Sequence, residues 1–464
     1  MADLRVNFCG IESPNPFWLA SGPPTNTAGQ VMRAFDAGWG GAVWKTLGEP
    51  IVNVSSRYSS VDWNRQRMMG LNNIELITDR PLSVNLREIS DVKKRYPRHA
   101  VIASLMVESK REAWREIVRQ SEDAGADGLE LNFGCPHGMS ERGMGSAVGQ
   151  VPEYTEMITG WVKEAAKTPV LVKLTPNISD IRMVARAAKR GGADGLSAIN
   201  TINSITGIDL DSLTPRPDVG GKSSHGGYCG PAVKPIALHM IQQIGADQDS
   251  SLPVSGIGGI SGWQDAAEFI LLGAGTLQVC TAAMHYGFRI VEDMIDGLSN
   301  WMDSKGFRTM EDFRGLSLAR VVEWKDLDLN YKIVARIHPD KCIGCELCYT
   351  ACWDGAHQCI HLDRAGSANA NVHRTPAQVE AESRSRIAST PIAKLDGANG
   401  SSEGPYATPL ERIPRVDEIE CVGCNLCALV CPVDGCISME QVETGKAPET
   451  WAQRAALPGK EGSC

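Results

Sequence analysis

The chain has 464 residues, of which 42% are hydrophobic and 22% charged, and its formal net charge is -9. This composition is typical of a folded globular protein and excludes wholesale disorder, and the length allows one large domain together with a small one. Because 55 acidic side chains outnumber 46 basic ones, we expect neither nucleic acid nor an anionic membrane as a general partner.

Cysteine use and apolar patterning indicate the compartment. The longest apolar stretch, residues 269–284, is broken by glycines and Gln278 and is shorter than the roughly 20 residues of a membrane span. The N-terminus lacks the apolar core of a secretory signal, so we expect a cytoplasmic protein. In that compartment thiols stay reduced, and clustered cysteines among the 15 present are more often metal ligands than disulfides.

Up to about residue 300, short apolar runs alternate with amphipathic stretches, the pattern of repeated βα units on a parallel sheet. Eight strands are predicted at residues 18–21, 42–45, 101–105, 128–132, 170–174, 195–200, 254–257 and 276–280. Eight such units predict an α/β fold of the (β/α)8 TIM barrel type over residues 1–310. Several strands end on a polar residue, namely Lys45, Asn132, Lys173 and Asn200. In such a barrel the carboxyl ends of the strands form the active-site rim.

Beyond the barrel the composition changes. We predict a helical linker over residues 311–335 and a small α+β domain over residues 336–464. Within it, residues 364–411 are rich in Ala, Ser, Gly, Pro and Asn and have one aromatic residue, so they are expected to form a surface insertion without a core of its own.

Two cysteine runs with one spacing lie on either side of this insertion. They are Cys342-x-x-Cys345-x-x-Cys348-x-x-x-Cys352 and Cys421-x-x-Cys424-x-x-Cys427-x-x-x-Cys431-Pro432. This is the bacterial ferredoxin run, in which three thiolates bind one [4Fe-4S] cluster and the fourth crosses to the other cluster. The predicted ligand sets are therefore Cys342, Cys345, Cys348 and Cys431 for one cluster and Cys421, Cys424, Cys427 and Cys352 for the other. The domain is thus predicted as a bacterial-type 2[4Fe-4S] ferredoxin.

Structural zinc is the alternative for these cysteines, but zinc sites usually combine two C-x-x-C pairs instead of two triplets with a trailing cysteine. Cys359 and Cys436 follow the two runs and fall outside the ligand pattern. We interpret them as buried structural thiols.

Iron-sulfur clusters pass single electrons, so the chain is expected to contain a second redox centre. No strand is followed by the G-x-G-x-x-G of a Rossmann nicotinamide site. Glycine-rich segments at residues 255–260 and 273–281 instead end the seventh and eighth strands, where barrels often bind phosphate on backbone amides.

Four segments of the barrel resemble the FMN-binding barrel of the dihydropyrimidine dehydrogenases, relatives of dihydroorotate dehydrogenase. They are Leu-Asn-Phe-Gly-Cys-Pro-His-Gly at 131–138, Val-Lys-Leu-Thr-Pro-Asn at 172–177, Ala-Ile-Asn-Thr at 198–201 and Gly-Ile-Gly-Gly at 256–259. The resemblance resumes at the two cysteine runs and is greatest to the bacterial subunit that carries FMN and iron-sulfur clusters. It implies a hetero-oligomer in which a separate partner subunit binds FAD and NAD(P)H.

The resemblance also assigns roles to residues. Cys135 matches the general acid that gives a proton to pyrimidine C5 while flavin N5 gives hydride to C6, and His137 lies on the same catalytic loop. The positions that hydrogen-bond the amide edges of the pyrimidine are Asn73, Asn132, Asn200 and Thr201. The positions that contact FMN are Ser21, Lys45, Thr46, Lys173, Asn200, Gly230, Gly258, Gly259, Cys280 and Thr281. A fixed cation such as Lys45 or Lys173 stabilises the negative charge that develops on a reduced flavin.

The leading hypothesis is therefore a subunit that reduces the C5=C6 bond of uracil or thymine. Gly134 stands where many relatives have a substrate-contacting serine, and this motivates a second hypothesis, an enzyme acting on dihydroorotate or another cyclic substrate. A third hypothesis is an electron-transfer module with a non-catalytic barrel.

Overall fold

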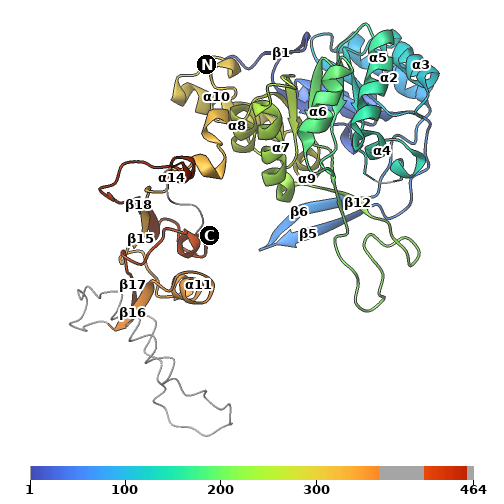
Figure 1. Ribbon diagram of the computed structural model, residues 1–464. Coiled ribbons are helices and arrows are strands. Elements are labelled where there is room, and N and C mark those ends of the chain that lie inside the picture. The colour runs from blue at the N-terminus through green and yellow to red at the C-terminus, as the bar shows by residue number, and fades with distance from the viewer. Residues whose placement is uncertain (1, 137, 365–411, 457–464) are drawn as a thin grey trace. The chain divides into compact units, whose positions relative to one another are not determined.

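The computed structural model describes residues 2–136, 138–364 and 412–456 (Figure 1). The chain divides into two compact units, Met1–Val321 and Val322–Cys464. Two predicted features, His137 and nearly all of the insertion at 364–411, lie outside the described residues.

The first unit is a closed parallel barrel in the order β10-β13-β14-β3-β4-β7-β8-β9. Its strands are β3 (Phe17–Leu19), β4 (Gly41–Leu47), β7 (Ala100–Leu105), β8 (Gly128–Asn132), β9 (Val170–Lys173), β10 (Gly195–Ala198), β13 (Val254–Ile257) and β14 (Ala274–Val279). Each corresponds to one predicted strand, so the predicted (β/α)8 barrel is confirmed. The predictions succeed because all eight strands are buried on both faces and are mainly apolar, with few polar residues.

Helices surround the barrel, as the alternation of elements along the chain requires (Figure 1). The longer ones are α1 (Ala28–Ala37), α2 (Leu82–Arg95), α3 (Arg111–Asp123), α5 (Pro152–Ala165), α6 (Ile181–Arg190), α7 (Lys234–Ala246), α8 (Trp263–Leu271) and α10 (Ile290–Lys305), and the shorter ones are α4 (Ser146–Gly149) and α9 (Thr281–Tyr286). Capping residues set the ends of these helices. In α1, the Thr27 side chain accepts a hydrogen bond from the backbone N–H of Gln30, and Gly38 ends the helix at a φ of 114°.

A second sheet, absent from the sequence-based prediction, lies at one end of the barrel (Figure 1). Its order is β11-β12-β6-β5, and the strands are β5 (Tyr58–Trp63), β6 (Gln66–Asn73), β11 (Ile202–Ser204) and β12 (Gly226–Cys229). β6 ends at Asn73, β11 begins directly after Thr201, and β12 ends directly before Gly230. The sheet thus fixes the backbone next to three predicted site residues. Its strands, of sequence YSSVDW, QRMMGLNN, INS and GGYC, are rich in polar residues and glycine, so they lack the apolar runs that reveal the barrel strands.

The second unit is built from two similar halves, each a strand, a short helix and a strand. The first half is β15 (Ile333–Ile337), α11 (Leu347–Gly355) and β16 (Ile360–Arg364), and the second is β17 (Arg412–Val416), α13 (Leu426–Leu429) and β18 (Ile437–Gln441). The first strand of each half pairs antiparallel with the last strand of the other, β15 with β18 and β17 with β16. A further short helix, α14 (Trp451–Ala455), follows. This is the α+β arrangement expected of a two-cluster ferredoxin.

The segment predicted as a helical linker, residues 311–335, contains short 3-10 turns, including Leu318–Arg320 and Trp324–Asp326, and the start of β15. The division between the two units falls within it, after Val321. Among the helices of the described residues, none combines the length and apolar character needed to cross a membrane.

Candidate active site

A pocket opens where the barrel strands end. It is lined by residues at or just beyond the carboxyl ends of seven barrel strands, all except β7, together with parts of β5, β6 and β12. Ligand pockets in barrel enzymes occupy this end because eight βα loops converge there. The wall contains both polar and apolar groups, which suits a ring-shaped organic cofactor with a substrate.

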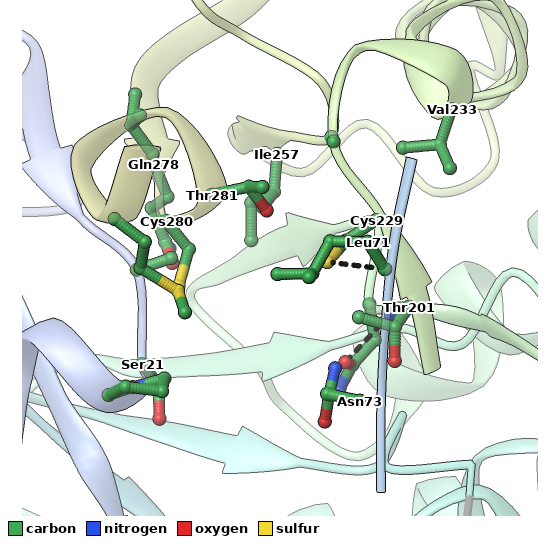
Figure 2. Close-up of a pocket in the computed structure, with 18 of the residues that line it drawn as sticks. Ser21, Leu71, Asn73, Thr201, Cys229, Val233, Ile257, Gln278, Cys280 and Thr281 are labelled. Carbon is green, nitrogen blue, oxygen red and sulfur yellow. Dashed lines mark hydrogen bonds between the residues drawn. The ribbon is translucent and has the colours of Figure 1, made fainter. Parts of the chain in front are cut away.

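All of the predicted barrel-site residues that lie in the described part of the chain line this one pocket. They are Ser21, Lys45, Thr46, Asn73, Asn132, Cys135, Lys173, Asn200, Thr201, Gly230, Gly258, Gly259, Cys280 and Thr281. Figure 2 shows Asn73 and Thr201 close together, with Ser21 and Cys280 across the pocket from them. Residues that are far apart in sequence are therefore brought to a single cavity.

A continuous chain of hydrogen bonds links the polar residues of the wall. The Thr46 hydroxyl lies 3.1 Å from the Ser21 hydroxyl and accepts from the Asn132 amide nitrogen at 2.9 Å. The Asn132 amide oxygen accepts from the Asn200 amide nitrogen at 2.9 Å, and the Asn200 oxygen accepts from the Thr201 backbone N–H at 2.8 Å. Each side chain fixes the rotamer of the next, so this wall is preorganised for hydrogen bonding.

Two lysines in the pocket are each paired with a buried carboxylate. The ammonium of Lys45 hydrogen-bonds Glu75, which also accepts from the Tyr58 hydroxyl. The ammonium of Lys173 lies 3.5 Å from the Glu130 carboxylate, and the Glu130 side chain is fully buried. A buried charge is costly without a partner, which explains the pairing. The two lysines therefore bring positive charge to the pocket wall, and Arg57 lies 3.7 Å from Glu75 as a second cation beside that carboxylate.

Beneath the pocket, the barrel interior contains a polar layer around Glu130. Gln278 on β14 donates to the Glu130 carboxylate at 2.9 Å and lies 3.2 and 3.3 Å from the Ser197 and Ser255 hydroxyls. Gln278 is one of the residues that line the pocket, and its amide oxygen is buried and has no hydrogen-bond partner within the described protein. An orphaned acceptor of this kind fits a site that receives a donor from a bound ring.

Cys135 lies in the loop that follows β8 and is 7% exposed. Its backbone carbonyl accepts from the Ser146 N–H at 3.0 Å, and the adjacent Pro136 carbonyl lies 3.2 Å from Nε2 of His225. Ile77, Met106, Met139 and Met144 pack around the thiol side chain. The loop thus holds the Cys135 thiol at the pocket wall in a largely apolar setting.

Gly134 allows a close approach of Asn200. A Cβ atom at this position would lie 2.4 Å from the Asn200 Cβ, well inside contact distance. A Cβ atom added at Gly227 would likewise lie 2.2 Å from the Thr201 hydroxyl oxygen. The glycine at 134 therefore has a structural reason in this protein: it makes room for the amide of Asn200 beside Asn132.

Two further thiols line the pocket, Cys229 and Cys280. Burial raises the pKa of Cys229 to about 11 and that of Cys280 to about 12. Both therefore stay neutral thiols near neutral pH. The Cys229 thiol donates to the Leu71 carbonyl at 3.2 Å, which is visible in Figure 2.

Sequence reasoning missed the partners of the lysines, Glu75 and Glu130, and the amide that orients Glu130, Gln278. A signal for Glu130 was present, because it precedes Asn132 by two positions in a strand and must face the same side of the sheet. Glu75 stands two residues after Asn73, but it lies beyond the end of β6, where no periodicity applies.

In the second unit the cysteines gather into two separate cavities. One is lined by Cys421, Cys424, Cys427 and Cys352, and the other by Cys342, Cys345, Cys348 and Cys431, which are the two predicted crossed sets. A fifth cysteine joins each cavity, Cys359 in the first and Cys436 in the second. Two groups of convergent thiols, each drawn from both halves, fit a pair of iron-sulfur clusters.

Comparison with known proteins agrees with the fold and the pocket. The family model described as Dihydroorotate dehydrogenase matches residues 3–302, which include the whole barrel. The class defined by the barrel and its pocket is therefore that of the dihydroorotate dehydrogenase-type oxidoreductases.

More specific relatives cover most of the chain. It is 48% identical over 360 residues to the NAD-dependent dihydropyrimidine dehydrogenase subunit PreA of Escherichia coli (strain K12), covering 77% of this chain and 87% of that protein. It is 43% identical over 339 residues to the chloroplastic dihydropyrimidine dehydrogenase (NADP(+)) of Arabidopsis thaliana, covering 70% and 79%. It is 37% identical over 319 residues to the catalytic subunit of dihydroorotate dehydrogenase B (NAD(+)) of Pyrococcus abyssi, covering 68% and 99%. The chain belongs to the dihydropyrimidine dehydrogenase family, which confirms the resemblance found in the sequence.

Proposed function

We propose that this chain is the pyrimidine-reducing subunit of an NAD(P)-linked dihydropyrimidine dehydrogenase. It reduces the C5=C6 bond of uracil or thymine to the 5,6-dihydropyrimidine. The observation that supports this most directly is the convergence of Cys135, two buried lysines and the asparagine wall on one pocket. The names of the Escherichia coli and Arabidopsis relatives support the same reaction.

The pocket suits FMN. Lys45 and Lys173 would stand beside the ring system, Ser21 and Thr46 would bond its polar edge, and the orphaned Gln278 oxygen would accept from it. The phosphate would bind the backbone and hydroxyl groups of Gly230, Gly258, Gly259, Cys280 and Thr281. Gly230, Gly258 and Gly259 have φ angles of 93°, 129° and 75°, which other residues rarely adopt and which open the amides of these loops. When bound, FMN supplies hydride from its N5 atom.

The substrate binds through the asparagines. Uracil and thymine present alternating N–H and C=O groups, and the amides of Asn73, Asn132 and Asn200 offer a donor and an acceptor each. The Thr201 hydroxyl completes the set. Because the rotamers of Asn132 and Asn200 are fixed by their mutual hydrogen bond, little ordering is left to occur on binding.

Cys135 acts as the general acid and delivers its proton to C5 from Sγ. Its place in the pocket wall supports this role, because a thiol that lies beside the substrate can donate its proton to C5. We assign His137 to the same catalytic loop.

Electrons reach the barrel site through two [4Fe-4S] clusters in the second unit, from a partner subunit that binds FAD and NAD(P)H. The two crossed cysteine sets support the clusters. The word subunit in the names of relatives supports a partner. Clusters held by reduced thiols fit a cytoplasmic hetero-oligomer.

The test is dihydrouracil formation by the chain together with its partner subunit. Cys135→Ala is expected to lower turnover by about 10²- to 10⁴-fold, the usual contribution of a general acid, while the flavin content stays unchanged. Cys9→Ala is the matched control, since Cys9 lies in the barrel unit outside the residues that line the pocket. Near-normal uracil reduction by the Cys135 variant would show that Cys135 is not the general acid.

A second candidate is an enzyme of the same class that acts on dihydroorotate or another cyclic substrate. The 37% identity to a dihydroorotate dehydrogenase B catalytic subunit favours it. Turnover of dihydroorotate with none of uracil would decide for this alternative. A spectrum with cluster bands and no flavin would instead favour an electron-transfer module with a non-catalytic barrel.

A further inference from the structure

We infer that Cys359 and Cys436 are alternate cluster ligands: each can take over one corner of its iron-sulfur cluster when a neighbouring ligand thiolate is lost. The inference rests on the proposed clusters and concerns two residues that the ferredoxin spacing leaves without a role. Each cluster cavity then has five thiols for four corners.

Cys359 lies among the ligands of one cluster. Its Sγ is 3.6 Å from Sγ of Cys352 and is also in contact with the thiol of Cys421. These two neighbours come from opposite halves of the unit and belong to the same predicted ligand set. Cys359 is 5% exposed and lines the cavity that this set surrounds.

Cys436 has the equivalent relation to the other cluster. Its thiol contacts Cys431 and Cys342, again one ligand from each half and both from a single predicted set. Cys436 is 2% exposed and lines the second cavity. The fifth thiol is therefore a feature of both clusters.

The internal repeat gives both residues the same backbone support. Cys359 directly precedes β16 and Cys436 directly precedes β18, the last strands of the two halves. The Cys359 carbonyl accepts from the Asp417 N–H at 2.7 Å, and the Asp417 carbonyl accepts from the Cys421 N–H at 2.9 Å.

In the other half, the Cys436 carbonyl accepts from the His338 N–H at 2.8 Å, and the His338 carbonyl accepts from the Cys342 N–H at 3.1 Å. Each fifth thiol is thus tied through two backbone hydrogen bonds to the first cysteine of the ligand run beside it. This arrangement keeps the thiol at the cluster whether or not it is bound to iron.

A role in packing alone does not require a thiol at these two positions. An apolar side chain of similar size would fill the same space, whereas a thiol that touches two ligands can itself bind iron. In that exchange an Fe–S bond forms at the open corner, the bound water or hydroxide leaves, and the thiol proton passes to solvent. No electron is transferred.

The test compares iron content and the low-temperature EPR spectrum of the reduced clusters in the full chain. Wild type is expected to hold about eight irons in two [4Fe-4S] clusters. Cys352→Ala is expected to keep about eight irons with a changed EPR signal for one cluster, because Cys359 replaces the lost ligand. The double variant Cys352→Ala/Cys359→Ala is expected to lose that cluster or convert it to a three-iron form.

Cys424→Ala is the control within the same cavity. Cys424 is exposed, and the contacts of Cys359 are to Cys352 and Cys421, so the loss of Cys424 is expected to damage the cluster to the same extent with or without Cys359. The second cluster supplies an independent pair, Cys431→Ala with and without Cys436→Ala, in case the Cys352 variants do not fold.

Equal iron content and identical spectra in both single and double variants of the two pairs would overturn the inference. A wild-type chain without iron would instead overturn the proposed clusters, so the two failures are distinguishable.

Discussion

The barrel and the second unit build their sites in opposite ways. In the barrel, the predicted site residues that line the pocket run from Ser21 to Thr281 and meet only when eight strands close. In the second unit, six of the eight predicted ligands lie within two short triplets, and only Cys352 and Cys431 must cross between halves. The barrel has a large apolar core, whereas about half of the buried core of the second unit consists of cysteines. The barrel pocket is therefore formed by a fold that its own apolar core stabilises. In the second unit, bound iron-sulfur clusters are expected to stabilise the fold.

The largest expected effect comes from removing a cluster ligand that is buried. Cys427→Ser is expected to eliminate one cluster and to lower NADH- or NADPH-linked turnover more than about 100-fold, because electron transfer from the partner is interrupted. The barrel is expected to keep its flavin and to be reduced normally by dithionite. Iron analysis, stopped-flow flavin reduction and turnover check this. A variant that also loses its flavin would show that the two sites depend on each other.

The next effect tests the barrel through the buried pair of Lys173 and Glu130. Lys173→Met or Glu130→Gln alone is expected to lower the free energy of unfolding by about 3–5 kcal/mol, because each leaves a buried group of the pair without its partner. The double variant is expected to be destabilised by clearly less than the sum, since no charge then stays unpaired. Urea denaturation of the four proteins measures the coupling. If the destabilisation of the double variant equalled the sum of the two single variants, Lys173 and Glu130 would not be coupled as an ion pair.

A smaller effect is expected at Gly134. Gly134→Ala places a Cβ 2.4 Å from that of Asn200 and is expected to displace the Asn200 amide, at a cost of about 1–3 kcal/mol, seen mainly as a raised KM for the pyrimidine. The matched control is Gly29→Ala in α1, where nothing lies within 4 Å of the added atom. That helical substitution is expected to be neutral or slightly stabilising. Equal KM values for wild type and the Gly134 variant would count against the asparagine wall as the substrate site.

The smallest effect concerns the barrel surface. The Arg80 guanidinium, with help from the Ala28 N–H, holds the pKa of the Glu88 carboxyl below its usual value. A carboxyl whose pKa is depressed on folding stabilises the protein above its unfolded-state pKa, and that stabilisation is lost as the pH falls through the lower folded-state pKa. Glu88→Gln is therefore expected to remove less than about 1 kcal/mol at pH 7 and nothing at strongly acidic pH. Urea midpoints across this range check the difference.

Prediction from sequence succeeded where the signal was local or strongly periodic. The barrel strands are buried on both faces, so their apolar runs identified all eight, and the C-x-x-C-x-x-C runs identified the cysteines that surround each cavity. It failed for the β5, β6, β11 and β12 sheet, whose strands are rich in polar residues and glycine, and for the acidic partners of the lysines. Those partners come from other strands or loops, and nothing in the local pattern connects them.

The sequence by itself determined the repeated βα units, the two cysteine runs and the family, because burial on both faces and fixed ligand spacing leave a record in neighbouring residues. Only the tertiary structure decided that Glu75 and Glu130 neutralise the two lysines, that Gly134 makes room for Asn200, and that a fifth thiol enters each cysteine cavity. These contacts join residues far apart in the chain. Their distances are set by barrel closure and by the pairing of the two halves, which no local pattern encodes.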